Sequence, residues 1–443
     1  MKQALVFSEA LSLGPGRDGW YIFNYMKQLL LLLALVIGGG APTGQAAPII
    51  RLQLDTKPLS RSLTCRYTFA LPAADTATSI VLLLSREFRI LNLNASQAAQ
   101  PCVTRVYYPF FADTLQRLQV RYAALRSRKS RRLTLTYSGV LGKALATEQV
   151  MVFSGHSNWI PFRPYREYEV VDYVLDVRVP AGEQVVSTTP ALRHRNGQWR
   201  FRGRTSLIEI TALVARRFQQ LASATQPRVT VLKTGAALNS QDTIILRKAE
   251  EIAAFYNRSI GREAPIARFS IFLPGTNSDA FGLLNDATVI TYSDFDMAKR
   301  GELLILAHEI SHKWWGYGSV HDENDWLNEA FATYSSLLYL QAAGDAAGYQ
   351  AELTRLIQTV ANTPAILGFD RTKYERSMYR RVVYNKGTGV LAALHARVGT
   401  EQFFNLMAKT AAKKVSTTAA FLGVVEQVAG PETRAWLLAE LRR

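Results

Sequence analysis

The residues with the clearest capacity for chemistry lie in the stretch HEISHKWWGYGSVHDENDWLNE, from His308 to Glu329. His308 and His312 are four residues apart, and on a helix this spacing puts both imidazoles on one face, about one turn apart. Two imidazoles and one carboxylate suit a zinc ion that keeps a water in its fourth position. Glu309 directly follows His308, so its carboxylate can act as general base toward that water. The stretch therefore predicts a zinc-dependent hydrolase with one Zn²⁺.

The third metal ligand has two candidates. The apolar run ELLILA, residues 302–307, would bury the first helix. Burying a polar group without a partner costs about 1–3 kcal/mol, so a buried helix with two histidines needs a compensating ligand such as a metal. Glu329 lies in a second helical segment, whereas His321 reads as a loop residue in HDEND. A HExxHxxGxxH ligand order would need a histidine at position 318, which is Gly318. We therefore expect Glu329 to be the ligand.

HEISH followed by WLNEAFATY resembles the gluzincin zinc metallopeptidases of the alanyl aminopeptidase and leukotriene hydrolase family. The family's connecting segment is two residues longer than the one here. The resemblance covers about residues 150–440, most sharply 280–392. It extends to a YxKG motif, Tyr384 to Gly387, whose tyrosine stabilises the oxyanion in the family. A hydroxyl aimed at the developing oxyanion can contribute a few kcal/mol, so the resemblance implies that Tyr384 is catalytic.

The sequence departs from the family where the substrate's amino group is bound. Family members carry GxMEN upstream of HExxH, and its glutamate holds the free α-amino group. Aligning the strand at Ile290 to Tyr292 puts Asn285 at the place of that glutamate, with Asp286 one residue away. An amide has no charge, although its carbonyl can accept a hydrogen bond. The expected substrate-binding residues are Gly282, Leu283, Leu284 and Asn285.

The resemblance implies aminopeptidase action on a peptide or protein substrate. The change at Asn285 keeps an endopeptidase, an atypical exopeptidase and a non-catalytic peptide-binding module open as alternatives. The chain also ends about sixty residues after Tyr384, which leaves no room for the C-terminal helical domain of the larger relatives. We therefore expect a short form with a more open cleft.

The chain divides into four parts by pattern. Residues 1–25 look like a misassigned start. Residues 26–46 have the order of a signal peptide, with Met26-Lys27, an apolar run at 29–37 and small residues before cleavage after Ala46. We expect export to the periplasm or outside, with no stable membrane insertion after cleavage. The alternative is an uncleaved signal that anchors the chain in the membrane.

The two remaining parts differ in periodicity. Residues 47–224 contain short alternating apolar runs separated by turn signals, which predict an N-terminal all-β saddle or sandwich domain. Residues 225–443 combine a few strands with helical patterns, and the resemblance implies an α+β thermolysin-like zinc peptidase domain there. Helices are predicted over residues 242–261, 300–316, 324–344 and 386–399.

The net charge of +17, from 52 basic and 35 acidic residues, indicates a solvated basic surface. The densest basic run, Arg126 to Arg132, lies between two strand-like segments and reads as a hairpin tip. No nucleic-acid-binding motif accompanies it, so no nucleic-acid partner is expected. Cys65 and Cys102 could form one disulfide or remain two buried thiols. The sequence leaves the oligomeric state open.

Overall fold

A computed structural model describes residues 49–71, 78–95, 101–111, 113–122, 131–275, 289–291 and 296–443. Residues Pro48–Arg443 form one compact unit. The expected misassigned start and signal segment, residues 1–46, lie outside the described residues. Among the described residues, no helix has both the length and the apolar character needed to cross a bilayer.

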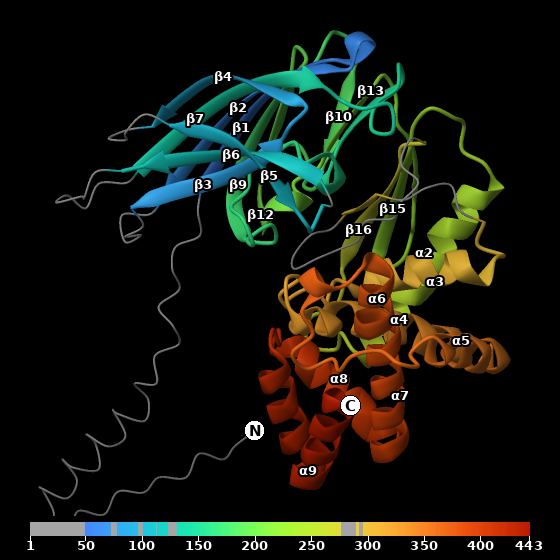
Figure 1. Ribbon diagram of the computed structural model, residues 1–443. Helices are drawn as coiled ribbons and strands as arrows, with labels where there is room; N and C mark the ends of the chain where they lie inside the picture. The colour runs from blue at the N-terminus through green and yellow to red at the C-terminus, as the bar shows by residue number, and fades with distance from the viewer. Residues whose placement is uncertain are drawn as a thin grey trace, which may run out of the picture. The chain divides into compact units, whose positions relative to one another are not determined.

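The first part of the compact unit consists of β-strands (Figure 1). Side chains along β1 and β9 are buried at every second position, as the pleat of a strand with one face on a core requires. One seven-stranded sheet has the order β11-β12-β9-β1-β2-β7-β4, and two three-stranded sheets have the orders β3-β6-β5 and β10-β13-β8. The strands are β1 (Ile49–Lys57), β2 (Ser62–Leu71), β3 (Ser79–Ser85), β4 (Phe88–Ala95), β5 (Cys102–Tyr108), β6 (Asp113–Arg121), β7 (Arg131–Val140), β8 (Val150–Phe153), β9 (Val170–Arg178), β10 (Gln184–Ser187), β11 (Arg193–Arg195), β12 (Gln198–Ser206) and β13 (Ala212–Ala215).

These sheets share one hydrophobic core. Leu52 and Leu135 of the seven-stranded sheet belong to the same buried cluster as Leu84 and Leu115 of the β3-β6-β5 sheet. The expected hairpin around Arg126 to Arg132 is therefore wrong. The strands on its two sides, β6 and β7, pair with other strands and belong to different sheets. Both have the period of half-buried strands, and strand period does not reveal which strand is the partner.

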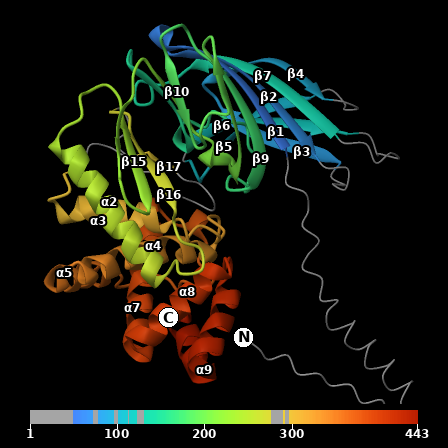
Figure 2. The same cartoon turned by 180° about the vertical axis from the view of Figure 1, so that it is seen from behind.

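The second part contains a four-stranded sheet and the helices (Figures 1 and 2). The sheet has the order β14-β15-β16-β17, with β15, β16 and β17 parallel. The first strand of this sheet, β14, precedes residue 225 and pairs with β15. The predicted domain boundary after residue 224 stays a prediction. The strands are β14 (Gln219–Ala222), β15 (Arg228–Lys233), β16 (Arg268–Leu273) and β17 (Val289–Thr291). The helices are α2 (Ser240–Ser259), α3 (Arg300–Ser311), α4 (Trp326–Ala342), α5 (Ala346–Gln358), α6 (Arg376–Tyr379), α7 (Gly387–Val398), α8 (Thr400–Ala412) and α9 (Thr418–Arg442).

The predicted fold class, an all-β region followed by an α+β region of thermolysin type, is confirmed. Helix α3 is shorter than expected. It ends at Ser311, and the backbone bond from Trp314 N–H to the Ser311 carbonyl (3.0 Å) belongs to a tighter turn. The sequence prediction ran on to Gly316 because the residues after Ser311 are largely apolar. An apolar pattern indicates burial, but it does not show where an α-helix changes to a tighter turn.

Specific contacts fix the two helices that carry the predicted metal ligands. The Tyr256 hydroxyl of α2 donates a hydrogen bond to the Ala307 carbonyl of α3 at 3.0 Å. The Trp326 indole N–H at the start of α4 donates to Thr418 Oγ1 of α9 at 2.9 Å. Both tyrosine and tryptophan are fully buried, so each bond satisfies a polar group inside the core. Helix α3 is thereby tied to α2, and helix α4 to α9.

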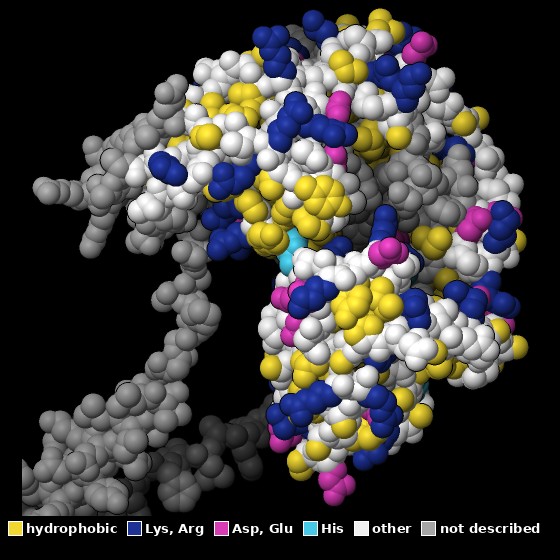
Figure 3. Space-filling view, viewed as in Figure 1, with side chains coloured by type: hydrophobic (Ala, Val, Ile, Leu, Met, Phe, Trp, Pro, Cys, Tyr) yellow, Lys and Arg dark blue, Asp and Glu magenta, His cyan; other side chains and the backbone are white. Residues whose placement is uncertain are grey.

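Neither cysteine is in a disulfide. Cys65 is buried in β2, and Cys102 is exposed at the start of β5. The two alternatives of one disulfide or two buried thiols are therefore both replaced by one buried and one exposed thiol. On the face shown in Figure 3, Lys and Arg side chains lie over the β region and the helical region alike. The positive charge on this face is thus spread out.

Candidate active site

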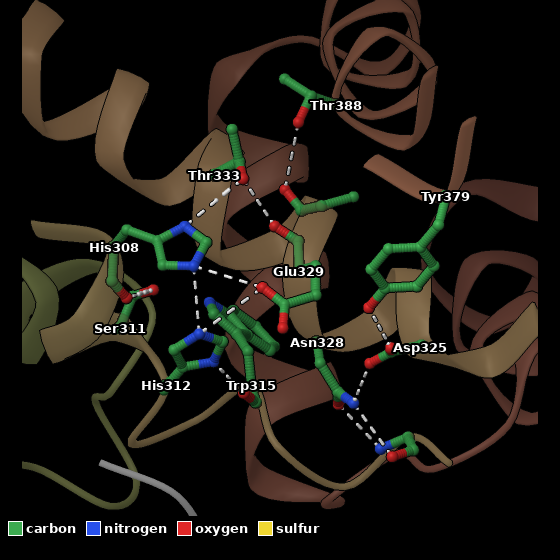
Figure 4. Close-up of polar contacts among 12 residues, drawn as sticks. His308, Ser311, His312, Trp315, Asp325, Asn328, Glu329, Thr333, Tyr379 and Thr388 are labelled. Carbon is green, nitrogen blue, oxygen red and sulfur yellow. Dashed lines mark hydrogen bonds and ion pairs between the residues drawn. The ribbon is translucent and has the colours of Figure 1, made fainter. Parts of the chain in front are cut away.

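Three predicted ligands meet between α3 and α4 (Figure 4). His308 lies in the last turn of α3, His312 caps its C-terminal end, and Glu329 lies in the first turn of α4. Glu329 Oε2 is 3.3 Å from His308 Nε2 and 3.7 Å from His312 Nε2, and the two Nε2 atoms are 3.1 Å apart. All three side chains are largely buried. The sequence spacing has therefore brought one carboxylate and two imidazoles to a single point.

The hydrogen bonds of the two Nδ1 atoms decide which nitrogen of each imidazole carries the proton. His312 Nδ1 is 2.7 Å from the Trp315 carbonyl, which can only accept, so Nδ1 carries the proton. Thr333 uses its hydroxyl proton on the Glu329 carbonyl (2.7 Å), so it accepts from His308 Nδ1 at 3.3 Å. Both Nε2 atoms are then free of hydrogen in the neutral rings. Such hydrogen bonds orient metal-binding imidazoles in proteins.

This donor set fits a zinc ion. Three lone-pair atoms lie 3.1 to 3.7 Å apart, while tetrahedral zinc ligands with bonds of about 2.1 Å are about 3.4 Å apart. Glu329 Oε2 is buried without a hydrogen-bond donor among the described residues. Lone pairs that face one another repel, and a cation between them removes that repulsion. His308, His312 and Glu329 would hold the zinc ion.

Glu309 lies on α3 next to His308 and lines the same cavity as the three ligands. Burial raises the pKa of Glu309 to about 7, with a smaller contribution from the Glu329 charge and an opposing one from His312. A carboxyl with a pKa near neutrality can take up and release a proton during a reaction at neutral pH. Burial favours the neutral form of Glu329 too, but the interactions with His308, His312 and Tyr384 outweigh burial and bring the pKa of Glu329 down to about 2. The two acids of the site thus have different proton affinities.

Tyr384 lies on a π-helix, Arg380–Lys386, which links α6 to α7. Its ring stacks with the His308 ring at a centroid distance of 6.1 Å. Burial and the charges of Glu329 and Asp325 raise the pKa of Tyr384 well above its usual range, so the hydroxyl keeps its proton. Single π-turns occur frequently at functional sites. The widened turn leaves a phenol donor next to the metal ligands.

A buried acid, Asp325, immediately precedes α4, the helix that carries Glu329. Asp325 accepts hydrogen bonds from the Tyr379 hydroxyl and from Asn328 Nδ2 (2.9 Å). The Asn328 amide also bonds both backbone groups of Gly318, at 2.9 Å each. A Cβ at position 318 would lie 2.3 Å from the Asn324 carbonyl oxygen, so glycine is required there. These contacts hold the segment between the second histidine and Glu329 in one conformation.

The three ligands open onto a cavity of about 1130 Å³. Its walls come from β5 and the following turn, from α3 and α4, and from α5, α6 and the π-helix. This volume would accept several residues of a peptide. The lining includes Tyr107, Phe110, Tyr168, Ile208, His308, Glu309, His312, Glu329, Arg355, Arg371, Arg376, Arg380 and Tyr384.

His321, the rival ligand, lies elsewhere. Its Nε2 is 2.7 Å from Oε2 of Glu167, a buried residue between β8 and β9. The Tyr108 hydroxyl donates to the other oxygen of Glu167, and the Tyr165 ring packs edge-on against His321 at 4.8 Å. His321 therefore joins the loop between α3 and α4 to the β region. The predicted substrate-binding residues Gly282, Leu283, Leu284 and Asn285 lie outside the described residues.

The structure adds residues that the sequence did not single out. Thr333 lies one turn after Glu329, and that spacing was a signal that it shares a helix face with the ligand. Glu209 ends a 3₁₀ turn between β12 and β13 and is 2% exposed. Burial and the Glu309 charge raise the pKa of Glu209 well above its usual range, and its Oε1 has no hydrogen-bond partner among the described residues. The sequence did contain a signal for Glu209, because it is the one acidic residue inside the apolar run LIEITALVA.

Residues 283–421 match the sequence profile of the Peptidase family M1 domain. Aminopeptidase N of Streptomyces lividans is 23% identical over 297 residues, which are 60% of this chain and 34% of that protein. Probable aminopeptidase 1 of Saccharolobus solfataricus is 24% identical over 256 residues, 52% of this chain and 32% of that protein. The chain thus spans about a third of the length of the curated relatives it matches.

Solved structures share the fold over nearly the whole chain. An M1 zinc metallopeptidase from Deinococcus radiodurans has a TM-score of 0.64 at 20% identity, covering 90% of this chain and 94% of that one. A mutant of that enzyme has been solved with a Tyr-Ser-Ala substrate, with a TM-score of 0.63 and the same identity and coverage. At this level of identity the likeness concerns the fold.

Proposed function

We propose that this chain is a zinc-dependent peptidase of the aminopeptidase type, because residues 283–421 match the Peptidase family M1 domain. The observation that carries the proposal is the convergence of His308, His312 and Glu329, whose ligand atoms lie within 4.8 Å of one another. The curated relatives named above are aminopeptidases, which supports the reaction class. One zinc ion is proposed, in keeping with one group of three ligands.

A zinc ion bound there would polarise the scissile carbonyl and lower the pKa of its water. Glu309 then accepts a proton from the attacking water and delivers it to the leaving amine. Its pKa of about 7 before any metal binds suits both steps, and a nearby cation would lower that value. Tyr384 donates its hydroxyl proton in a hydrogen bond to the developing oxyanion, because its raised pKa keeps it protonated.

The assignment as an aminopeptidase rests on the resemblance to that family rather than on the proposed metal ligands. Asn285 stands where relatives of this family bind the amino group with a glutamate, so we keep an endopeptidase and an atypical exopeptidase as second candidates. We further propose that the chain is exported, on the basis of the signal-like segment 26–46.

Wild type, two variants and two substrates test the proposal. Bound zinc and turnover are measured for wild type, Glu309→Gln and Tyr384→Phe with a free-amine peptide and the same peptide acetylated. We expect zinc in all three proteins and a loss of about 10²–10⁴-fold in kcat for Glu309→Gln, as for loss of a general base. Zinc without any turnover that depends on Glu309 would point to a peptide-binding module. Equal turnover of the acetylated peptide would overturn the aminopeptidase assignment.

A further inference from the structure

The cavity wall formed by α6 and the π-helix carries a row of cations that leads to the metal ligands. Arg376, Arg380 and Tyr384 follow one another at intervals of four residues, so they lie roughly on one face of this helical segment. The Arg380 guanidinium lies over the Tyr384 ring, 4.6 Å from its centroid. All three residues line the same cavity as His308 and Glu329. A fixed positive charge is thus placed next to the proposed oxyanion donor.

The two arginines of this row differ from their neighbours in the cavity. Arg355 forms an ion pair with Glu352 at 2.8 Å, and Arg371 donates to the Val320 carbonyl at 2.6 Å. Within the described part of the chain, no ion pair involves Arg376 or Arg380. A guanidinium presents several N–H donors in a planar fork that matches a carboxylate in two parallel hydrogen bonds. The row therefore offers unused donors to a carboxylate inside the cleft.

We propose that Arg376 and Arg380 form an anion subsite that binds the free C-terminal carboxylate of a short peptide substrate. This inference rests on the proposed peptidase function and names the substrate class of that site. Because the cations lie beyond Tyr384 on one wall, the substrate's C-terminal end runs along this wall and its ammonium end runs away from it. The subsite then selects peptides by length as well as by charge.

The helical rise gives the expected length. At the α-helical rise of roughly 1.5 Å per residue, Arg380 would be about 6 Å and Arg376 about 12 Å from Tyr384 along the axis, and the π-turn makes both spans somewhat shorter. An extended peptide advances about 3.3–3.6 Å per residue. A carboxylate one or two residues beyond the scissile bond would therefore meet Arg380, and one three or four residues beyond it would meet Arg376. Longer peptides would carry their carboxylate past the row.

The test compares one peptide series as free acids and as C-terminal amides, at lengths of two to eight residues. Wild type is expected to cleave short acids at least about tenfold better in kcat/KM than their amides, since a hydrogen bond to a charged group contributes about 1.5–3 kcal/mol. The advantage should disappear at the longest lengths. Equal kcat/KM for acids and amides at every length would overturn the proposal.

Variants test whether the preference for acids over amides comes from Arg376 and Arg380. Arg376→Gln and the double variant with Arg380→Gln should lower the acid-to-amide ratio towards one, mainly through KM. Arg355→Gln is the matched control, because it removes a cavity arginine that already has an ion pair, and it should keep the wild-type ratio. An unchanged ratio in the double variant would overturn the assignment. If amides with an internal Asp or Glu are cleaved as fast as free acids, the subsite binds side-chain carboxylates and the C-terminal assignment is wrong.

Binding separates this inference from the proposed function. Calorimetry with Glu309→Gln protein measures the affinity for a tripeptide acid and its amide without turnover. Tighter binding of the acid, lost in the Arg380→Gln background, supports the subsite even if wild type hydrolyses no peptide. Turnover of peptides with equal binding of acid and amide would leave the peptidase in place and remove the subsite.

Discussion

Glu329 at the metal centre and Glu209 at the end of the β region are both buried acids with opposite preferences for the proton. Glu329 lies against two imidazoles, and its interactions with them help to bring its pKa down to about 2 despite burial. For Glu209, burial and the Glu309 charge both act in the other direction and raise its pKa. The same side chain is therefore an anionic ligand in one region and a neutral acid in the other. The difference teaches that neighbours, more than burial, decide which acid can bind a cation.

The largest expected effect is the loss of zinc from Glu329→Gln. An amide oxygen has nearly the same shape but no charge, so it no longer balances the cation. We expect zinc affinity to fall by more than about 100-fold, which exceeds the usual effect of changing a group that only orients a ligand. Zinc content after dialysis measures this. Glu209→Gln is the matched control and should retain zinc, and loss of zinc from both variants would remove the contrast between the two regions.

The next effect concerns catalysis at the metal centre. Tyr384→Phe should lower kcat by about 10²–10³-fold, as for removal of one oxyanion donor. Zinc content and KM should change little, because the hydroxyl acts in the transition state. Tyr374→Phe, on the same cavity wall with its ring stacked on Phe369, should have little effect. A fall in kcat of equal size in both variants would show that the wall, and not the hydroxyl, is responsible.

A smaller effect is expected from the group that orients His308. Thr333→Val removes the oxygen that accepts the proton of His308 Nδ1. Zinc affinity should fall by about 10–100-fold, measured by competition with a chelator. Thr333→Ser keeps the hydroxyl and should stay near wild type. Similar affinities for Val and Ser would mean that the imidazole is oriented by packing alone.

The smallest effect on zinc binding should come from Glu209→Gln, whose consequence is a change in folding stability that depends on pH. Below the unfolded pKa of about 4.3 both states hold the proton, so burial of Glu209 costs no extra stability. As pH rises, the unfolded state loses the proton first, because the folded pKa is raised. Wild type therefore loses about 1.4 kcal/mol of stability per pH unit up to the folded pKa. The stability of Glu209→Gln should not show this decrease with pH, because glutamine does not titrate.

Urea unfolding of metal-free protein from pH 4 to pH 8 measures the difference between wild type and Glu209→Gln. Other buried acids titrate in both proteins and cancel in the comparison, apart from Glu309, whose charge acts on Glu209. Parallel stability curves would show that Glu209 is not a neutral acid in the folded state, and the opening contrast would fail.

The metal ligands were accessible from sequence because they depend on local spacing. His308 and His312 share a helix face by their separation alone, and Glu329 stands in a helix whose apolar neighbours bury it. The alternation of β1 and β9 likewise predicted half-buried strands. Their parallel pairing across more than a hundred residues could not be read from alternation, because a strand's period does not name its partner.

The sequence by itself predicted the candidate ligand set and the proposed base, the order of a β region and an α+β region, and the change at Asn285. Only the tertiary structure decided the partner of His321, the proton affinity of Glu209 and the placing of Arg380 over Tyr384. The physical reason is range. Helix and strand periods act over a few residues, whereas hydrogen bonding, desolvation and charge depend on segments that come together only in the folded chain.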